Sequence, residues 1–442
     1  MKKIVGILAA AAVLATSVFA ADVSAKVRVT GDIFSYDGTA IDKKEGKAAG
    51  SFSALRAATV SHAYDAPYAT LSTSTDNAGA SVNFTTGDDG TTDLGVSNVQ
   101  VWFKPIDVLK IQAGHHDLAM NKETIDWTST NSYGTFGYSL GFAQDALSLN
   151  VALGTGNNGW FFQDVVANKK DSTSPNAAYI NDLYANFAYS ADFGTISAMF
   201  EYKGKNWSDS GCNPDTIKFG AGYKNTFDAL TFFADVVGTS YSAWTDDEAK
   251  AIKAGANIEA KGDDDFEKEL DQAAKEAKFV AYTDKDGKNR SAFGFAVDAF
   301  VEYAQDALTV KGYLKLDIAD FGHVTKKDGE YKEDIMADNN TALTLKARVD
   351  YKLDNGIGLF AYFGCDNLLR KETKNGDKDP SSVFAATIKA GASGSVGICT
   401  WETSLNLSTG NNVGYKKGVD KDTWGKYDKV KVSMPVYIQV AF

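Results

Sequence analysis

The chain has 442 residues and a formal net charge of −12, from 57 acidic and 45 basic side chains. An acidic balance of this size argues against a nucleic-acid-binding protein, which presents basic surfaces. The mean hydropathy of −0.24, together with 20 Tyr and 26 Phe, suits a protein with one face in water and one in an apolar phase.

Residues 1–20 have the pattern of a secretory signal peptide. Two lysines precede a short apolar run, and small residues stand at Val18 and Ala20. The apolar run is shorter than the roughly 20 residues that a membrane-spanning helix needs. We therefore predict export across the inner membrane, cleavage after Ala20 and a functional region covering residues 21–442.

Residues 23–36 alternate between apolar and polar side chains, which is the pattern of a strand with two different faces. Further alternating segments follow in eight pairs, each joined by a short connection rich in Asp, Asn, Gly or Pro, as tight hairpin turns require. The pentapeptide AQDAL stands at two of these turns, at residues 143–147 and 304–308. We predict that both copies are hairpin tips.

Longer, charged and glycine-rich connections separate the hairpins. They lie at residues 38–66, 115–133, 156–178, 239–290, 321–340, 365–382 and 408–428. Alternation of short and long connections is the layout of a transmembrane, antiparallel, up-and-down β-barrel. The eight hairpins, the first strand and a last strand predict an all-β barrel of about 16 to 18 strands, wide enough for an aqueous channel.

The connection at residues 241–290 differs in composition from the others. It contains DDDFEKELDQAAKEAKFVAY, whose acidic start and basic end favour a helix. We expect a helical insertion in this extracellular loop, either a lid on other loops or a constriction folded into the pore. The residues that would carry this role are Asp263, Asp264, Asp265, Phe266 and Leu270.

In a water-filled barrel, the polar positions of each strand face the lumen. Applied along the chain, this rule gives a small excess of basic lumen residues, most of it around residues 311–348, and so predicts a weak preference for anions. The predicted pore-lining residues are Lys26, Arg28, Asp32, Lys110, Lys311, Lys315, Lys346, Arg348, Asp350 and Lys389.

The sequence predicts no catalytic residue, metal site or cofactor. His115 and His116 are adjacent, so on a strand they would point to opposite faces. No GxSxG, HExxH, P-loop or GxGxxG motif accompanies them. The three cysteines are an odd number, so no disulfide framework is expected, and a single bridge from Cys212 to Cys365 is left open.

The last residues, VKVSMPVYIQVAF, alternate strictly up to Phe442. This ending resembles the terminal strand by which Gram-negative outer-membrane β-barrels are recognised for assembly, although Val440 stands where an aromatic is often found. With the signal peptide and the hairpin plan, the chain resembles porin-like proteins. The resemblance implies contact with outer-membrane lipid and with the outer-membrane assembly machinery, and passive diffusion of small hydrophilic solutes. It leaves monomer and homotrimer open.

Two other functions remain compatible with this sequence. A surface-exposed adhesin or antigen needs only the long loops. A transporter of hydrophobic substrates, of the fatty-acid type, needs an N-terminal hatch and an apolar interior. The polar face of the first strand, which carries Lys26, Arg28 and Asp32, argues against that interior.

Deletion of Phe442, the predicted assembly signal, should impair insertion more than it alters the stability of the folded barrel. Outer-membrane levels of the truncated and full-length proteins, measured by fractionation and surface labelling, test this expectation. Equal surface levels would contradict it.

Overall fold

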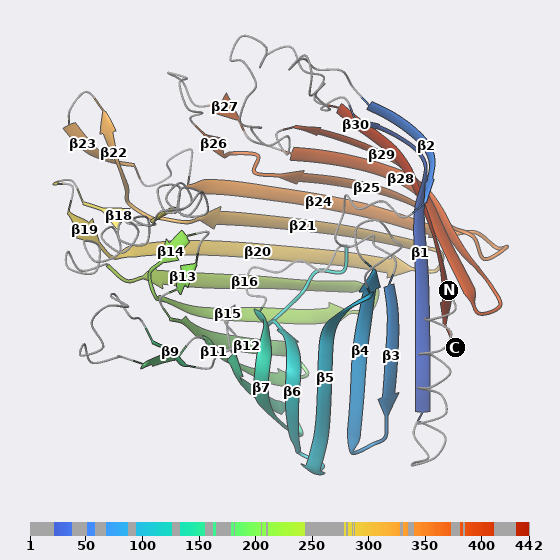
Figure 1. The fold of residues 1–442 in the computed structure, drawn as a ribbon, viewed down its shortest axis with the longest axis horizontal. Coiled ribbons are helices and arrows are strands. Elements are labelled where there is room, and N and C mark those ends of the chain that lie inside the picture. The colour runs from blue at the N-terminus through green and yellow to red at the C-terminus, as the bar shows by residue number, and fades with distance from the viewer. Residues whose placement is uncertain are drawn as a thin grey trace, which may run out of the picture.

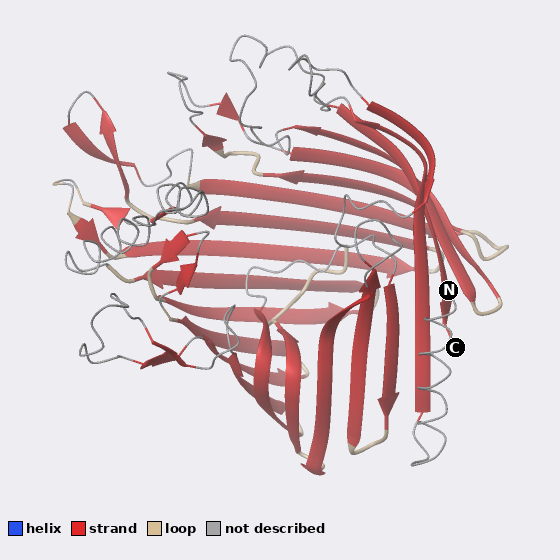
Figure 2. Cartoon of the chain, viewed as in Figure 1, coloured by secondary structure: helices blue, strands red, loops and turns tan. Residues whose placement is uncertain are grey.

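A computed structural model gives the fold of the chain. It describes residues 22–37, 51–57, 68–86, 94–125, 133–154, 162–164, 178–180, 182–204, 206–208, 211–243, 278–279, 282–284, 286, 288–327, 330–334, 340–372, 381–382, 385–410 and 430–441. Strands, turns and loops make up this part, and no helix occurs in it (Figure 2). None of the described residues belongs to a helix that could cross a membrane. The predicted helical insertion, including Asp263 to Leu270, and Phe442 lie outside the described residues.

One sheet of nineteen strands forms the body of the molecule (Figure 1). Its strands are β1 (Asp22–Asp37), β2 (Ser51–Ala57), β3 (Tyr68–Ser74), β4 (Ala78–Thr86), β5 (Leu94–Ile106), β6 (Leu109–Leu118), β7 (Tyr133–Gln144), β8 (Leu147–Gly154), β11 (Asp182–Ala191), β12 (Gly194–Lys203), β15 (Thr216–Phe227), β16 (Leu230–Tyr241), β20 (Ala292–Gln305), β21 (Leu308–Ile318), β24 (Thr341–Lys352), β25 (Gly358–Asp366), β28 (Ala385–Val396), β29 (Cys399–Gly410) and β30 (Val430–Ala441). Each strand pairs antiparallel with its neighbours, so the sheet follows the up-and-down order of the sequence.

The sheet closes because β1 pairs with β30, from Lys26 opposite Ala441 to Asp37 opposite Lys431. On its other side, β1 pairs with β2 near one end and with β3 near the other. The strands β2 and β3 therefore share one position, and the closed barrel has eighteen. This confirms the upper value of the predicted strand number. The sequence pattern had placed β2 inside a long connection.

Short strand pairs form within the long connections at one end of the barrel. They are β9 (Phe162–Asp164) with β10 (Ala178–Ile180), β13 (Asn206–Ser208) with β14 (Gly211–Asn213) and β17 (Lys278–Phe279), β18 (Tyr282–Thr283) with β19 (Asn289–Arg290), β22 (His323–Lys327) with β23 (Glu330–Asp334), and β26 (Lys371–Glu372) with β27 (Ser381–Ser382). All of them lie at the end where the longer connections run, opposite the tight turns.

Both AQDAL copies are hairpin tips, as predicted. The loop between β7 and β8 consists of Asp145 and Ala146, and the loop between β20 and β21 has the same two residue types. The turn between β15 and β16 repeats Asp–Ala–Leu a third time. Asp145, Asp228 and Asp306 all have a positive φ near 50°. Asp adopts this left-handed conformation more readily than most residues, which explains the repeated choice.

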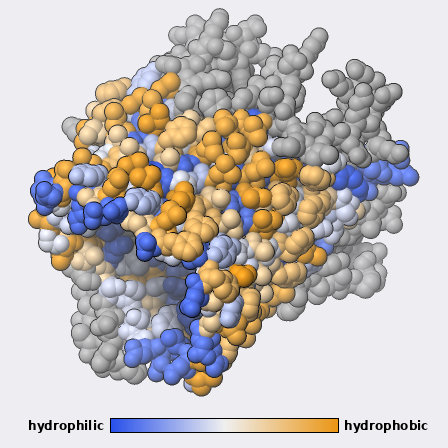
Figure 3. Space-filling model, turned by 180° about the vertical axis from the view of Figure 1, so that it is seen from behind, coloured by the Kyte–Doolittle hydropathy of each residue, from blue (hydrophilic) through white to orange (hydrophobic). Residues whose placement is uncertain are grey.

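The two faces of the barrel wall differ in chemistry. The predicted outward residues of β5 are highly exposed: Val101 is 52% and Phe103 48% accessible. On β21, Leu314 is exposed while its neighbour Tyr313 on the opposite face is buried. Apolar side chains spread over much of the visible wall, and most hydrophilic ones lie toward its margins (Figure 3). An apolar outer band is the surface that lipid requires.

One expectation about local structure was wrong, and one open point is decided. His115 and His116 belong to β6 rather than to a loop, because β6 continues to Leu118 in register with β7. Cys365 is a free, buried cysteine, so it forms no bridge to Cys212.

Candidate functional site

The segment that follows β6, residues 119–125, lies on the inner face of the barrel. It leaves the end of β6 and reaches β24, which stands nine of the eighteen strand positions away from β6. Its side chains contact successive strands between β8 and β25, always on the face opposite to the exposed apolar residues. The segment therefore crosses the inner wall over about half of the strand positions and narrows the interior. Three groups of contacts and the side chain of Ile125 hold it there.

The first contact is apolar. Met120 and Leu118 pack against a buried cluster of Ala152, Tyr184 and Met199 on β8, β11 and β12. The close approach depends on Gly220 of β15, where an added Cβ would lie 3.0 Å from the Met120 methyl carbon. A side chain at this position would require the Met120 methyl group to shift.

The second contact is a buried hydrogen bond. The amide Nδ2 of Asn121 donates to Oδ1 of Asp235 on β16 at 2.7 Å, and the Asp235 side chain is fully buried. An added Cβ at Gly222 of β15 would meet Asp235 Oδ1 at 2.2 Å and Asn121 Nδ2 at 3.0 Å. Gly222 thus provides the space in which this bond forms.

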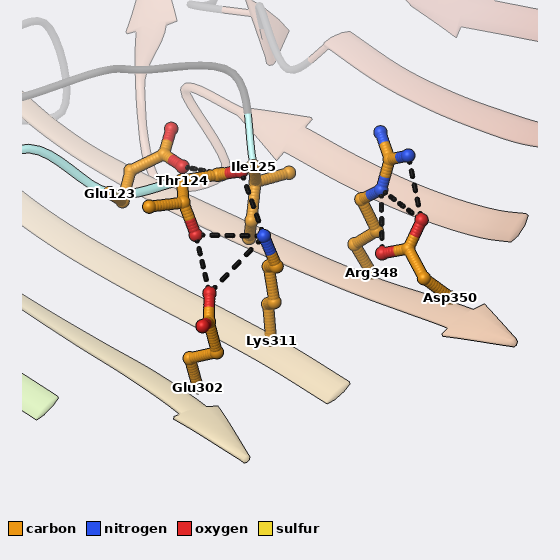
Figure 4. Close-up of polar contacts among 7 residues, drawn as sticks. All are labelled: Glu123, Thr124, Ile125, Glu302, Lys311, Arg348 and Asp350. Carbon is orange, nitrogen blue, oxygen red and sulfur yellow. Dashed lines mark hydrogen bonds and ion pairs between the residues drawn. The ribbon is translucent and has the colours of Figure 1, made fainter. Parts of the chain in front are cut away.

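The third contact consists of charged pairs on β20, β21 and β24. The Thr124 hydroxyl donates to Glu302 at 2.7 Å, and Lys311 Nζ donates to Thr124 Oγ1 at 2.8 Å while lying 3.2 Å from Glu302 (Figure 4). The fully buried Glu123 pairs with Lys346 at 3.4 Å. Bonds to charged groups each contribute about 1.5–3 kcal/mol, so this group is the strongest of the three.

Ile125 completes the docking. Its side chain lies in a buried cluster with Phe233, Phe300 and Tyr313, with Tyr362 packed against it. These aromatic residues occupy inward positions, where a water-filled channel would place polar side chains. These rings contact the docked segment and not water, which explains why apolar side chains occupy inward positions here.

Pairing changes the predicted charge balance of the wall. Lys311 and Lys346 contact Glu302 and Glu123, as described above. Arg348 holds Asp350 through two nitrogens, with Nε at 2.9 Å from Oδ2 and Nη2 at 2.7 Å from Oδ1 (Figure 4). The excess of positive charge expected around residues 311–348 is therefore largely neutralised by carboxylates.

The strands from β28 through β1 to β6 present a different inner wall. Here cations lie over aromatic rings: Arg28 over Tyr437 at 3.9 Å, and Lys110 over Trp102 at 5.1 Å. Lys26, Lys110 and Lys389 form no ion pair within the described part of the chain. Two further predicted pore-lining residues are acidic or paired. Asp32 lies on β1, and Lys315 on β21 pairs with Asp317.

A row of polar side chains continues this wall across β4 to β7. Gln100 donates to Ser81 at 2.9 Å, and Gln112 donates to Gln100 and contacts His116 Nδ1, both at 3.1 Å. His116 is buried, so it takes part in the row as a structural residue.

At the end of the barrel with the long connections, the short strands β18 and β19 are attached to the barrel next to β20 and β21. Arg290 Nη2 donates to both carboxylate oxygens of Asp320, at 2.9 and 2.7 Å. The Tyr282 ring packs against Tyr241 at 5.2 Å, and burial together with nearby Asp320 raises the pKa of the Tyr282 hydroxyl. These contacts attach the end of the connection that follows β16 to the barrel.

A closed antiparallel barrel of eighteen strands, apolar outside and polar inside, with tight turns at one end and long connections at the other, is the fold of the outer-membrane porins and channels. No protein-family model matches the sequence, and no curated protein matches it either.

Solved structures of outer-membrane proteins are similar to this chain. OccK2 (OpdF) of Pseudomonas aeruginosa aligns at 10% identity and a TM-score of 0.49, over 96% of this chain and 98% of its own. An anion-selective porin from Comamonas acidovorans aligns at 11% and 0.46, over 96% and 100%. OmpT of Vibrio cholerae, folded in vitro in its trimer form, aligns at 10% and 0.41, over 96% and 99%.

Proposed function

We propose that the protein is a channel of the bacterial outer membrane, through which small hydrophilic solutes diffuse passively with a weak preference for anions. One observation carries the proposal: residues 119–125 cross the inner wall between β8 and β25 and leave the strands from β28 through β1 to β6 with an inner face lined by polar and basic side chains. Tight turns would face the periplasm and long connections the outside.

The uncovered wall favours hydrophilic solutes. Ser81, Gln100 and Gln112 present hydroxyl and amide groups to the interior, and these groups replace part of the hydration of a polar solute. A transporter of hydrophobic substrates would need an apolar lining there.

The preference for anions rests on the same wall. The inward charged positions on strands β28 to β6 include the bases Lys26, Arg28, Lys110, Lys389 and Lys431 and the acids Asp22, Asp32, Asp37 and Glu402, so the basic excess is small. Loop acids count for less, because charges in water are screened beyond about 8–10 Å. Ions in the narrow region respond mainly to the wall.

Reversal potentials in a salt gradient across planar bilayers test both parts of the proposal. We expect stepwise conductance with a small anion preference, and we expect Lys110→Glu combined with Lys389→Glu to turn this into a cation preference. Lys352→Glu, the same charge change beside a tight turn, is the control and should shift the potential less. A folded protein that gives no conductance would favour an adhesin or antigen. Native mass spectrometry of the solubilised barrel distinguishes monomer from homotrimer.

A further inference from the structure

Two aromatic rings on the inner wall lie flat against the backbone beside the docked segment. Phe360 of β25 covers Gly391 of β28, where an added Cβ would lie 2.5 Å from the ring. Tyr362 of β25 covers Gly364, where an added Cβ would lie 2.2 Å from the Tyr362 hydroxyl oxygen. Because glycine leaves the backbone bare at both places, each ring can lie along the wall.

A cation lies over each of these rings. The Arg348 guanidinium carbon is 4.8 Å from the centre of Phe360, and Lys389 Nζ is 5.2 Å from the centre of Tyr362. A ring attracts a cation without neutralising its charge, unlike a carboxylate. The rings therefore help to position both cations. The charge of Lys389 stays available to a solute, whereas Arg348 pairs with Asp350 and offers only its Nη1 group, which points away from that carboxylate (Figure 4).

The two cations belong to one row across the wall. Arg348 stands directly opposite Tyr362, Tyr362 opposite Lys389, and Lys389 opposite Asn406 of β29. Neighbouring strands are about 4.8 Å apart, so the two cationic residues start roughly 10 Å apart at the backbone. Flexible side chains of this length can both reach a molecule placed between them.

The acids near this row are themselves occupied. Asp350 binds Nε and Nη2 of Arg348, which orients the guanidinium. Glu402 of β29 accepts a hydrogen bond from the Tyr437 hydroxyl at 3.2 Å, and Arg28 stacks on the Tyr437 ring. Lys389 forms no ion pair with any residue that the structure describes.

We propose that Arg348 and Lys389 form a binding site for small organic dicarboxylates on their way through the channel. Lys389 can pair with one carboxylate and the Nη1 group of Arg348 can bond the other, and charge-assisted hydrogen bonds of this kind are stronger than neutral ones. The partly exposed ring of Tyr362 offers an apolar contact to the carbon chain between the carboxylates, which chloride and phosphate cannot use. Asn406 is placed beside Lys389 to bond a polar substituent. The site deepens the proposed channel function and rests on it.

Calorimetric titration of the folded, detergent-solubilised protein with succinate tests this site without requiring conductance. We expect wild-type protein to bind succinate more tightly than acetate, phosphate or chloride. Lys389→Gln should raise the Kd for succinate about tenfold, as expected for loss of one charge-assisted hydrogen bond. Lys389→Arg should retain binding, which shows that the effect of the glutamine variant is not misfolding.

Lys26→Gln is the matched control, since it removes the same charge from the same uncovered wall at a position outside the row. It should leave the Kd for succinate within about twofold, well below the tenfold effect of removing a charge-assisted hydrogen bond. Absence of succinate binding in the wild type, or equal losses in Lys26→Gln and Lys389→Gln, would overturn the proposal. Bilayer conductance is a separate readout: its absence would contradict the channel function, whereas conductance without succinate binding would contradict only this site.

Discussion

Replacing Gly222 by alanine is expected to weaken the docking of residues 119–125 on the barrel wall and to raise single-channel conductance. The new Cβ would overlap Asp235 Oδ1 at 2.2 Å, so the bond from Asn121 to Asp235 cannot form as it does now. Loss of a hydrogen bond to a charged group costs about 1.5–3 kcal/mol, which lowers the docking equilibrium about ten- to a hundredfold.

Gly312→Ala is the matched control for this experiment. Gly312 lies on β21 on the outward face, and its added Cβ would meet only Val301, at 3.4 Å. This variant should conduct like the wild type. Should a folded Gly222→Ala barrel also conduct like the wild type, residues 119–125 would not be the constriction.

A positive charge should be tolerated on one face of β24 and not on the other. Leu345→Arg places a cation beside the exposed Leu314 on the lipid-facing side, at a cost of about 2–4 kcal/mol near the membrane midplane. Thr344→Arg points into water opposite Lys315 and should cost well under about 1 kcal/mol.

Urea unfolding of both variants in lipid vesicles measures this difference. The variants differ by a single position along one strand, and both introduce the same residue. Comparable losses of stability would mean that the assignment of the two faces is wrong.

The repeating parts of the barrel were predictable from the sequence because they depend on neighbours in the chain. The period-two pattern fixes which residues of β21 and β24 share a face. The Asp–Ala turns follow from local backbone preference, as at Asp145 and Asp306. The pair of Arg348 with Asp350 could also have been expected, since residues two apart on a strand point the same way.

The docked segment was not predicted, because its position depends on side chains from across the barrel. The sequence predicted a possible constriction in the helical pattern after β16. It predicted no special role for the connection after β6. A signal was nevertheless present: Phe233, Phe300 and Tyr313 are apolar residues at inward positions, and Gly220 and Gly222 are side-chain-free positions on one face. Together they indicate a wall that receives another part of the chain.

The pairing of wall charges was missed for the same reason. Lys311 meets Glu302 only once the register of β20 and β21 is known, and Lys346 meets Glu123 only once residues 119–125 are in place. Counting charges by face therefore predicted their location but not their neutralisation.

The pairing of β1 with β30 closes the barrel, and this step differs from the other steps of folding. Every other barrel neighbour is also a neighbour in chain order, so those contacts are local and quick to form. Lys26 and Ala441, by contrast, are about 400 residues apart in the sequence, so this contact is the least local one in the barrel. Until that step the growing sheet keeps two unpaired edges, each able to pair with another chain. Closure is thus the slow, aggregation-sensitive step, and β30 must be kept from wrong partners until β1 receives it.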